Sequence, residues 1–345
     1  MNGTSIKPAQ GPHVWHGSDY AGRDDWIYRF SPAALDDIAR AVAGVRERGL
    51  ALDDITTADF DLPALTRELA QMDDILRRGR GFVLLKGLPV ERYSDDEMAI
   101  ILWGIGTHLG IGVSQSHLGD RIGHVIDKGE TMRYYTAGGP IEVHMDPVDV
   151  TGLLCLREAR RGGASFVMSS FLIHNIIAEE RPDLLEVLRR GYFYGAQTAQ
   201  PGQSGQPITA TPNRIPVYTE IEGYPDCFFL PLAIRMVADM AGKPLGEAER
   251  EAVDYLQQVA ERPGVAMEMD IHPGDIQFLN NRLLLHARQD YEDWPEWERK
   301  RHLLRLWLMM PDWPERPEHL RMIRTSDRAG GGVPKSDPPL QAGLR

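Results

Sequence analysis

The combination of a His-x-Asp motif with a distant histidine constrains this chain more than any other feature of its sequence. His144 and Asp146 lie in segment 141–156, where β-branched and apolar residues predict two short strands around a turn. Side chains two residues apart on a strand point to the same face, so the two can present an imidazole and a carboxylate side by side. His286 follows the apolar run 283–285 far along the chain. Two histidines and one carboxylate on one face of a metal leave coordination positions open, which is typical of non-haem iron(II) oxygenases.

The composition supports one large folded core and disfavours several classes of protein. With 345 residues, the chain can bury roughly three quarters of the surface that it exposes when unfolded. Its 42% hydrophobic and 26% charged residues are ordinary for a globular protein. The net charge of −12 disfavours nonspecific binding to nucleic acids and gives no long-range attraction for an anionic substrate. Local arginines would therefore have to capture such a substrate.

Cysteine content and hydropathy indicate the cellular setting. Cys155 and Cys227 are too few for a disulfide framework or a zinc-ribbon site. The first residues lack the charged and apolar regions of a signal peptide, and no stretch approaches the roughly 18 apolar residues of a membrane span. We therefore expect a cytoplasmic protein that binds neither nucleic acid nor membrane. Assembly into a homo-oligomer is left open.

Helix signals dominate the first third of the chain. Ser31 has the position of an N-cap, followed by a proline in the first turn, and Gly49 can end the same helix. A second helix is expected to open near Pro63, and a third at Ser94, which has the spacing of a capping box. Between these two helices, the segment 81–85 predicts a buried strand.

Strand signals dominate the rest of the chain. Short β-rich segments separated by Gly, Pro and Asp are typical of an all-β sandwich or barrel. We expect a single domain over 1–310, catalytic if the metal hypothesis holds, with a helical part at 1–110 and a sheet core at about 111–310. Residues 311–345 hold clustered Pro and Gly and predict a loosely ordered tail. The long polar segment 197–213 is expected to be either an active-site lid or a flexible surface loop.

Two arginines follow the distal histidine. Arg301 and Arg305 are four residues apart with apolar residues between them, a spacing that keeps both guanidiniums on one side of a strand or a helix. Arginine suits carboxylates because its planar guanidinium can grasp them with two hydrogen bonds. The alternative is that one or both form structural ion pairs, for example with Asp290 or Glu292.

Taken in order, these motifs resemble a known family. The run from H-x-D through G-G-x-S to N-x-x-x-x-x-H and a closing R-x-x-x-R is similar to the TauD/TfdA-like superfamily (taurine dioxygenase / clavaminate synthase) of iron(II)- and 2-oxoglutarate-dependent oxygenases. The resemblance covers roughly 81–312. It implies a mainly β fold with flanking helices, in which a double-stranded β-helix (jelly-roll, cupin-like) core is braced by the N-terminal helical region.

The resemblance also implies roles for the residues that match the family's motifs. His144, Asp146 and His286 would hold Fe(II), which 2-oxoglutarate would chelate as co-substrate. Arg301, the first arginine of the closing motif, would pair with the distal carboxylate of 2-oxoglutarate. Ser165 occupies a position at which relatives often carry Thr, so its hydroxyl is expected to donate a hydrogen bond to the same co-substrate.

Three more residues fall where relatives contact the primary substrate. Arg305 corresponds to a position that holds a substrate carboxylate or sulfonate in several relatives. Gln115 and Tyr134 lie upstream of the H-x-D motif, where relatives often line the substrate pocket; the alternative, which the sequence alone favours, is that both are ordinary sheet residues. This implies that the protein acts on a small-molecule substrate and uses O2 to oxidise it.

The leading hypothesis is an oxygenase that oxidises an unactivated C–H bond of a small, carboxylate-bearing metabolite such as an amino acid or a natural-product intermediate. Hydroxylation, desaturation and ring closure are all open as outcomes, whereas the carboxylate of Asp146 disfavours halogenation. One alternative is a zinc-dependent hydrolase that uses the same three ligands. Another is a non-catalytic jelly-roll protein that only binds its ligand.

Overall fold

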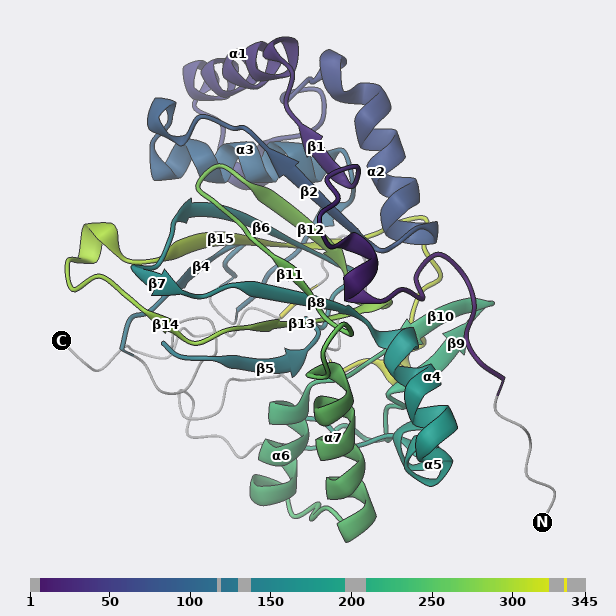
Figure 1. Ribbon diagram of the computed structural model, residues 1–345. Helices are drawn as coiled ribbons and strands as arrows, with labels where there is room; N and C mark the ends of the chain where they lie inside the picture. The colour runs from purple at the N-terminus through teal and green to yellow at the C-terminus, as the bar shows by residue number, and fades with distance from the viewer. Residues whose placement is uncertain (1–6, 117–118, 130–137, 196–208, 323–331, 334–345) are drawn as a thin grey trace.

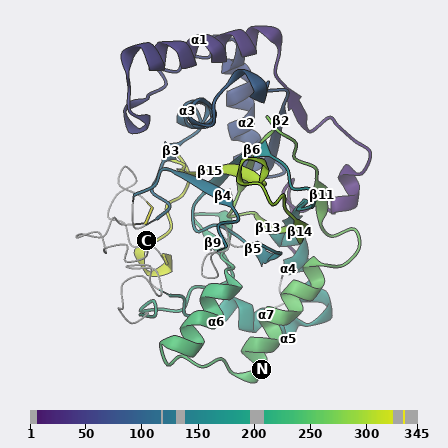
Figure 2. The ribbon, with the colours of Figure 1, turned by 90° about the vertical axis from the view of Figure 1, so that its left-hand side faces the viewer.

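Two β-sheets face each other at the centre of the structure, with helices at both ends (Figure 1 and, from the side, Figure 2). The computed structural model describes residues 7–116, 119–129, 138–195, 209–322 and 332–333. Within these residues the two sheets stay separate and do not close into a barrel. The predicted architecture, a jelly-roll core with flanking helices, is confirmed.

The larger sheet contains seven strands in the order β1-β2-β12-β6-β15-β3, and β4 pairs with β15. Only the β1–β2 pair is parallel among these strands. Alternate side chains of β15 face opposite layers: Leu304 and Leu306 pack in the core beneath the N-terminal helices, whereas Trp307 packs in the core shared with the smaller sheet. The strands are β1 Ile27–Arg29, β2 Phe82–Lys86, β3 Ile111–Gly112, β4 Ile122–Ile126, β6 Val150–Arg157, β12 Ile276–Asn280 and β15 His302–Met309.

The smaller sheet contains four antiparallel strands in the order β11-β8-β13-β5. Two short ribbons, β9–β10 and β7–β14, lie outside the two main sheets. The position of β13 between β8 and β5 matters most for function, because it brings the segment around His286 beside the segment around His144. The strands are β5 Ile141–His144, β7 Arg161–Gly162, β8 Ser165–Ser169, β9 Tyr218–Ile221, β10 Tyr224–Cys227, β11 Met267–Met269, β13 Leu284–Arg288 and β14 Tyr291–Glu292.

Three N-terminal helices cover the outer face of the larger sheet (Figure 1). They are α1 Pro32–Arg48, α2 Thr66–Arg78 and α3 Asp95–Thr107. Ser31 caps α1 by accepting a hydrogen bond from the backbone N–H of Ala34, and Gly49 ends it in the left-handed conformation, with φ of 63°. Ser94 and Glu97 form the expected capping box of α3. The predicted helix starts and the strand near 81–85 are confirmed.

Four further helices gather at the opposite end of the molecule. They are α4 Ser170–Glu180, α5 Pro182–Arg190, α6 Pro231–Met240 and α7 Glu247–Ala260. Ser169 ends β8 and caps α4 by accepting a hydrogen bond from Leu172 N. Apolar residues surround α4 on most sides, so it lacks the one-sided pattern that identifies a surface helix. None of the helices in the described ranges is long and apolar enough to cross a bilayer.

Part of the expected C-terminal tail packs onto the core. Trp313 and Met322 are each 3% exposed, so residues 311–322 do not form the loose extension that their Pro content suggested. Val333 is also buried, and its backbone N–H donates to the carbonyl of Ser114. Most of the remaining tail lies outside the described residues.

A buried ion network fixes the packed part of the tail. The Arg282 side chain is fully buried and donates from Nε to Asp226 Oδ1 at 2.6 Å and from Nη1 to the carbonyl of Pro314 at 2.5 Å. Arg316 shares the same carboxylate, with Nη2 2.9 Å from Oδ1. Asp226 therefore compensates one fully buried and one largely buried guanidinium.

We predict that Asp226→Asn destabilises the fold by about 3–5 kcal/mol, because it removes the carboxylate that pairs closely with two buried guanidiniums and leaves Arg282 only the Asp149 carboxylate at 3.9 Å. Denaturant unfolding followed by circular dichroism measures this loss. Asp74→Asn is the control, since Asp74 pairs with Arg78 on the surface of α2 and its loss should cost less than about 1 kcal/mol. Equal losses for the two variants would contradict the structural role of Asp226.

Candidate active site

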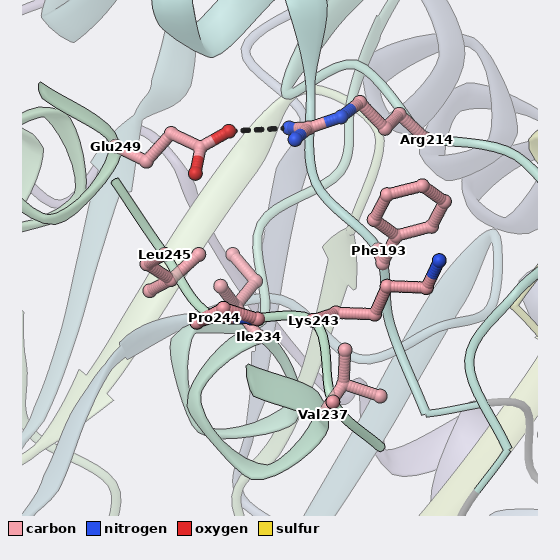
Figure 3. A pocket seen from close by; sticks show the side chains of 9 residues that line it. Phe193, Arg214, Ile234, Val237, Lys243, Pro244, Leu245 and Glu249 are labelled. Atoms are coloured by element: carbon pink, nitrogen blue, oxygen red, sulfur yellow. Dashed lines mark hydrogen bonds and ion pairs between the residues drawn. The ribbon is translucent and has the colours of Figure 1, made fainter. Parts of the chain in front are cut away.

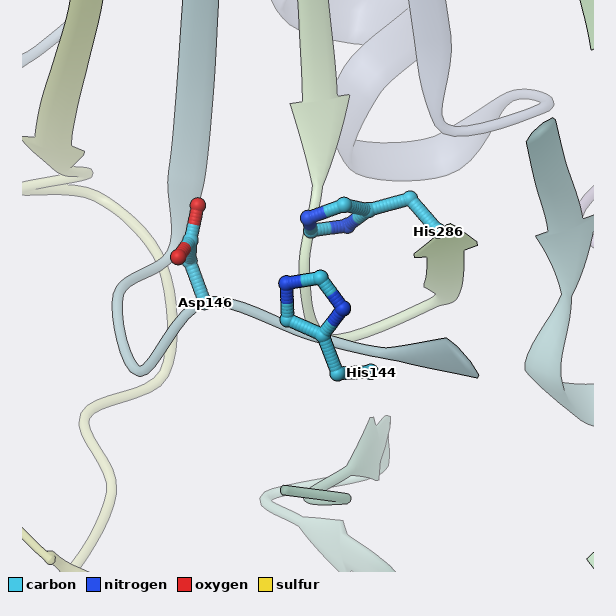
Figure 4. Close-up of side chains that lie close together, drawn as sticks. All are labelled: His144, Asp146 and His286. Atoms are coloured by element: carbon cyan, nitrogen blue, oxygen red, sulfur yellow. The ribbon is translucent and has the colours of Figure 1, made fainter. Parts of the chain in front are cut away.

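Three side chains from distant parts of the chain converge between the sheets (Figure 4). His144 ends β5, and His286 lies directly opposite on β13 in the antiparallel register. Their ring centroids are 4.3 Å apart. Asp146 follows β5, and the three residues offer one nitrogen or oxygen atom each within 4.8 Å of one another. In the part of the chain that the structure describes, this is the only group of three or more His, Cys, Asp or Glu residues with metal-site spacing.

The local structure around the H-x-D motif differs in one detail from the expected strand. Strand β5 stops at His144, so Asp146 lies in the connection to β6 rather than on a strand. Met145 between them is fully buried in the apolar core, and its backbone N–H donates to Phe229 O at 3.0 Å. The expected geometry therefore survives, because Met145 turns away and leaves its two neighbours facing the same space.

Both imidazoles are held in the form that binds metals. His144 Nδ1 lies 2.8 Å from the carbonyl of Glu142, which can only accept, so this nitrogen carries the proton and Nε2 keeps its lone pair. His286 Nδ1 is buried without a partner among the described residues. Shielding from water lowers the pKa of His144, and the same effect, followed by the nearby His144, lowers the pKa of His286 to about 3. Neutral imidazoles and a buried nitrogen without a partner fit a metal site.

The Asp146 carboxylate is fixed at both oxygens. Thr151 donates from its hydroxyl to Oδ2 at 2.9 Å, and Arg305 donates from Nη1 to Oδ1 at 3.1 Å. Asn281 accepts from the backbone N–H of Asp146 at 3.1 Å and donates to the Thr151 hydroxyl at 2.9 Å. Burial is the largest influence and would raise the pKa of Asp146, but Arg305, the two imidazoles and the Thr151 hydrogen bond together outweigh it and hold the pKa below its usual value. The carboxylate is therefore charged and oriented.

Arg301 lies immediately before β15 as a buried guanidinium without an acid. It is 6% exposed, and within the described ranges no carboxylate pairs with it. Its Nη2 donates to the carbonyl of Gly163 at 3.5 Å, and its guanidinium lies 5.4 Å from the centre of the Tyr291 ring. Glu292, one of the acids suggested as a structural partner, pairs with Arg160 and Arg161 instead. A buried guanidinium is costly without an anion, so this position is suited to bind one.

A second buried arginine, which the sequence analysis missed, lies beside the first. Arg288 is 7% exposed, donates to the carbonyl of Gly139 from Nε and Nη2, and lies 4.9 Å from the Tyr291 ring centre. Burial, followed by the charge of Arg301, lowers the pKa of Arg288 to about 10. Ser165 is its cross-strand partner on β8. The H-x-R spacing from His286 to Arg288 was the available signal, because residues two apart on β13 share a face.

The structure also brings together two of the three residues predicted to line the substrate pocket. Arg305 Nε donates to Gln115 Oε1 at 2.8 Å, both side chains are buried, and Arg305 also contacts Asp146. Tyr134 and most of the predicted lid, 197–213, lie outside the described residues. Thr151 and Asn281 had no separate signal in the sequence, since their role depends on how β6 and the turn before β13 pack around Asp146.

A small pocket of about 180 Å³ lies at the helical end of the molecule, away from the residues of this cluster (Figure 3). Phe193 forms one wall, with the Lys243 ammonium 4.7 Å and the Arg214 guanidinium 5.0 Å from its ring centre. Arg214 is paired with Glu249 at 2.6 Å. The remaining lining residues are mostly apolar: Ile234, Val237, Gly242, Pro244 and Leu245. The two cations of this pocket already contact an aromatic ring or an acid, so their positions are explained by packing and need no bound ligand.

Comparison with solved structures shows the same fold in two oxygenases. The structure superposes on an asparagine oxygenase in complex with Fe(II), hydroxyasparagine and succinate with a TM-score of 0.64 and 18% identity, covering 82% of this chain and 93% of that one. It also resembles the non-heme iron oxygenase OrfP in complex with Fe and alpha-ketoglutaric acid, with a TM-score of 0.59, 14% identity and coverage of 82% and 93%.

Sequence comparison identifies the family. This chain is 29% identical over 335 residues to FR-33289 synthase of Streptomyces rubellomurinus, which covers 94% of this chain and 96% of the relative. The family described as "Taurine catabolism dioxygenase TauD, TfdA family" matches residues 47–307, most of the chain. The chain therefore belongs to the TauD, TfdA family of non-haem iron dioxygenases, which use 2-oxoglutarate as co-substrate.

Proposed function

We propose that His144, Asp146 and His286 hold Fe(II), and that Arg301 binds the distal carboxylate of 2-oxoglutarate. The observation that carries this proposal is the convergence of two neutral imidazoles and an ionised carboxylate in the same buried space. Such a donor set binds Fe(II) on one face and leaves the other positions for the co-substrate and O2. When bound, iron and 2-oxoglutarate supply the oxidising chemistry, in which conversion of 2-oxoglutarate to succinate and CO2 accompanies oxidation of the substrate.

The residues around the three ligands would bind and orient the co-substrate. Arg301 offers a buried positive charge that no acid in the described residues neutralises, and Gly163 allows close approach to it. A Cβ at Gly163 would come within 3.1 Å of Arg301 Nε, and the backbone there has φ of 80°. Arg288 adds a second positive charge near Tyr291, and Ser165 opposite Arg288 has a hydroxyl to donate. A dianionic co-substrate would balance these charges.

The primary substrate is proposed to be a small, carboxylate-bearing metabolite such as an amino acid or a natural-product intermediate. The names of the relatives support this class: one synthesises FR-33289, and another oxidises asparagine. Arg305, Gln115 and Tyr134 are proposed to lie at the substrate side of the site. A substrate carboxylate would bind the guanidinium of Arg305, which already contacts Asp146 and Gln115. The carboxylate of Asp146 would occupy a ligand position on the metal, which favours hydroxylation, desaturation or ring closure of the substrate over halogenation.

The cellular setting is also a proposal. The net charge of −12 favours a protein that does not bind nucleic acids. We propose a cytoplasmic location without membrane association, since a net charge of −12 gives the chain no attraction to anionic membrane surfaces.

We predict that the protein converts 2-oxoglutarate to succinate in the presence of Fe(II), ascorbate and O2, and that His286→Ala lowers this conversion to background because the metal loses a ligand. Succinate is measured by mass spectrometry, with a panel of amino acids as substrates. His124→Ala is the control, since His124 lies on β4 and contacts His302 rather than the three ligands. Activation by zinc alone, without succinate formation, would favour the hydrolase alternative. Unchanged turnover in His286→Ala would show that the ligands are misassigned.

We predict that Arg301→Met raises the KM for 2-oxoglutarate by roughly 10- to 100-fold, because a charge-assisted hydrogen bond is worth about 1.5–3 kcal/mol. The affinity of the protein for Fe(II) alone should change little. Initial rates at varied 2-oxoglutarate concentration measure the KM, and Arg160→Met, which removes a half-exposed partner of Glu292, is the matched control. An unaltered KM in Arg301→Met would assign the distal carboxylate to another cation, and Arg288 would be the next to substitute.

A further inference from the structure

Arg305 is bound on three sides within the described structure. Its Nη1 donates to Asp146 Oδ1 at 3.1 Å, and its Nε donates to Gln115 Oε1 at 2.8 Å. Its guanidinium also lies 4.8 Å from the centre of the Trp307 ring, two residues further along the same face of β15. Arg305, Gln115 and Asp146 are each less than 10% exposed. These contacts fix the guanidinium before any substrate is bound.

Gln115 determines where the guanidinium points. Its Nε2 donates to the carbonyl of Arg305 itself at 2.6 Å and to the carbonyl of Arg121 at 2.9 Å. Both partners are acceptors, so the amide can adopt only the orientation in which Oε1 faces Arg305 Nε. The neighbouring strand leaves room for this amide at Gly123, where a Cβ would lie 2.7 Å from Oε1. Gln115 therefore clamps both the backbone and the side chain of Arg305.

The other oxygen of Asp146 is held by a separate hydrogen-bond chain. Thr151 donates to Oδ2, and Asn281 connects Thr151 to the backbone of Asp146. Rotation of the carboxylate would break either the Thr151 or the Arg305 contact. The two contacts together therefore set the plane in which the carboxylate lone pairs point.

On the basis of the proposed iron site, we propose that Arg305, clamped by Gln115, is a positioning residue for the metal ligand Asp146. Its contact with Oδ1 keeps the carboxylate oriented toward the two imidazoles before the metal arrives, so the site needs little rearrangement to bind it. Partners of this kind, one contact removed from a metal, typically change metal affinity by about 10–100-fold when they are mutated. Gln115 acts on the metal only through Arg305.

The test is metal affinity in the absence of 2-oxoglutarate and substrate. Purified protein is titrated with Co(II), or with Fe(II) under nitrogen, by calorimetry and by visible absorption of the Co(II) complex. We expect Arg305→Met to weaken metal binding by roughly 10–100-fold and Gln115→Ala by roughly 10-fold. Because Gln115 acts through Arg305, the double variant should bind no more weakly than Arg305→Met alone, a non-additivity that two independent effects would lack.

A matched control separates positioning from general loss of stability. Arg316→Met removes another buried guanidinium that pairs with an aspartate, Asp226, outside the metal cluster. It should lower the unfolding midpoint while the metal Kd of the folded protein is unchanged. Gln115→Ala provides a milder change should Arg305→Met fold poorly.

Two results would overturn the proposal. Metal binding in Gln115→Ala and Arg305→Met as tight as in the unmodified protein would leave Arg305 with a substrate role alone, seen as a raised substrate KM. Additive losses in the double variant would show that Gln115 does not act through Arg305. Both differ from failure of the proposed function, in which the unmodified protein itself neither binds the metal at this site nor forms succinate.

Discussion

The antiparallel register between β5 and β13 is the constraint on which the rest of the site depends. It places His286 directly opposite His144, with ring centroids 4.3 Å apart. A slip of one residue would turn one imidazole to the other face of the smaller sheet, because side chains alternate along a strand. The register is held from the other side as well, since β13 also pairs with β8 over five residues. The iron site that we propose would thus be built on ordinary sheet pairing.

The chain is acidic as a whole, but its core contains several buried positive charges. The chain carries a net charge of −12, yet three arginines are buried in and beside the strands β13 and β15: Arg288, Arg301 and Arg305. Each guanidinium has a different environment. Arg305 contacts Asp146 and Gln115, Arg288 contacts a backbone carbonyl, and Arg301 lacks an acid among the described residues. The interior therefore attracts anions that the surface does not, which suits a dicarboxylate co-substrate.

The sequence predicted the features that are encoded locally. Helix caps at Ser31 and Ser94 and the buried strand β2 follow from neighbouring residues, and the structure confirms them. The convergence of the three proposed ligands was suggested by the H-x-D motif and the distant His286, and the resemblance of the motif order and spacing to a family strengthened it. Thr151 and Asn281 were not predictable, since they reach Asp146 only once β6 and the turn before β13 are packed. Helix α4 was missed because its apolar residues surround the helix instead of forming one stripe.

The most direct measurement for the central claim is an anaerobic crystal structure with Fe(II) and 2-oxoglutarate. The account predicts iron bound by His144, Asp146 and His286, 2-oxoglutarate chelating the metal, and its distal carboxylate on Arg301. Asp146 should keep its contacts with Thr151 and Arg305. Iron bound elsewhere, or a co-substrate whose distal carboxylate points away from Arg301, would contradict the account.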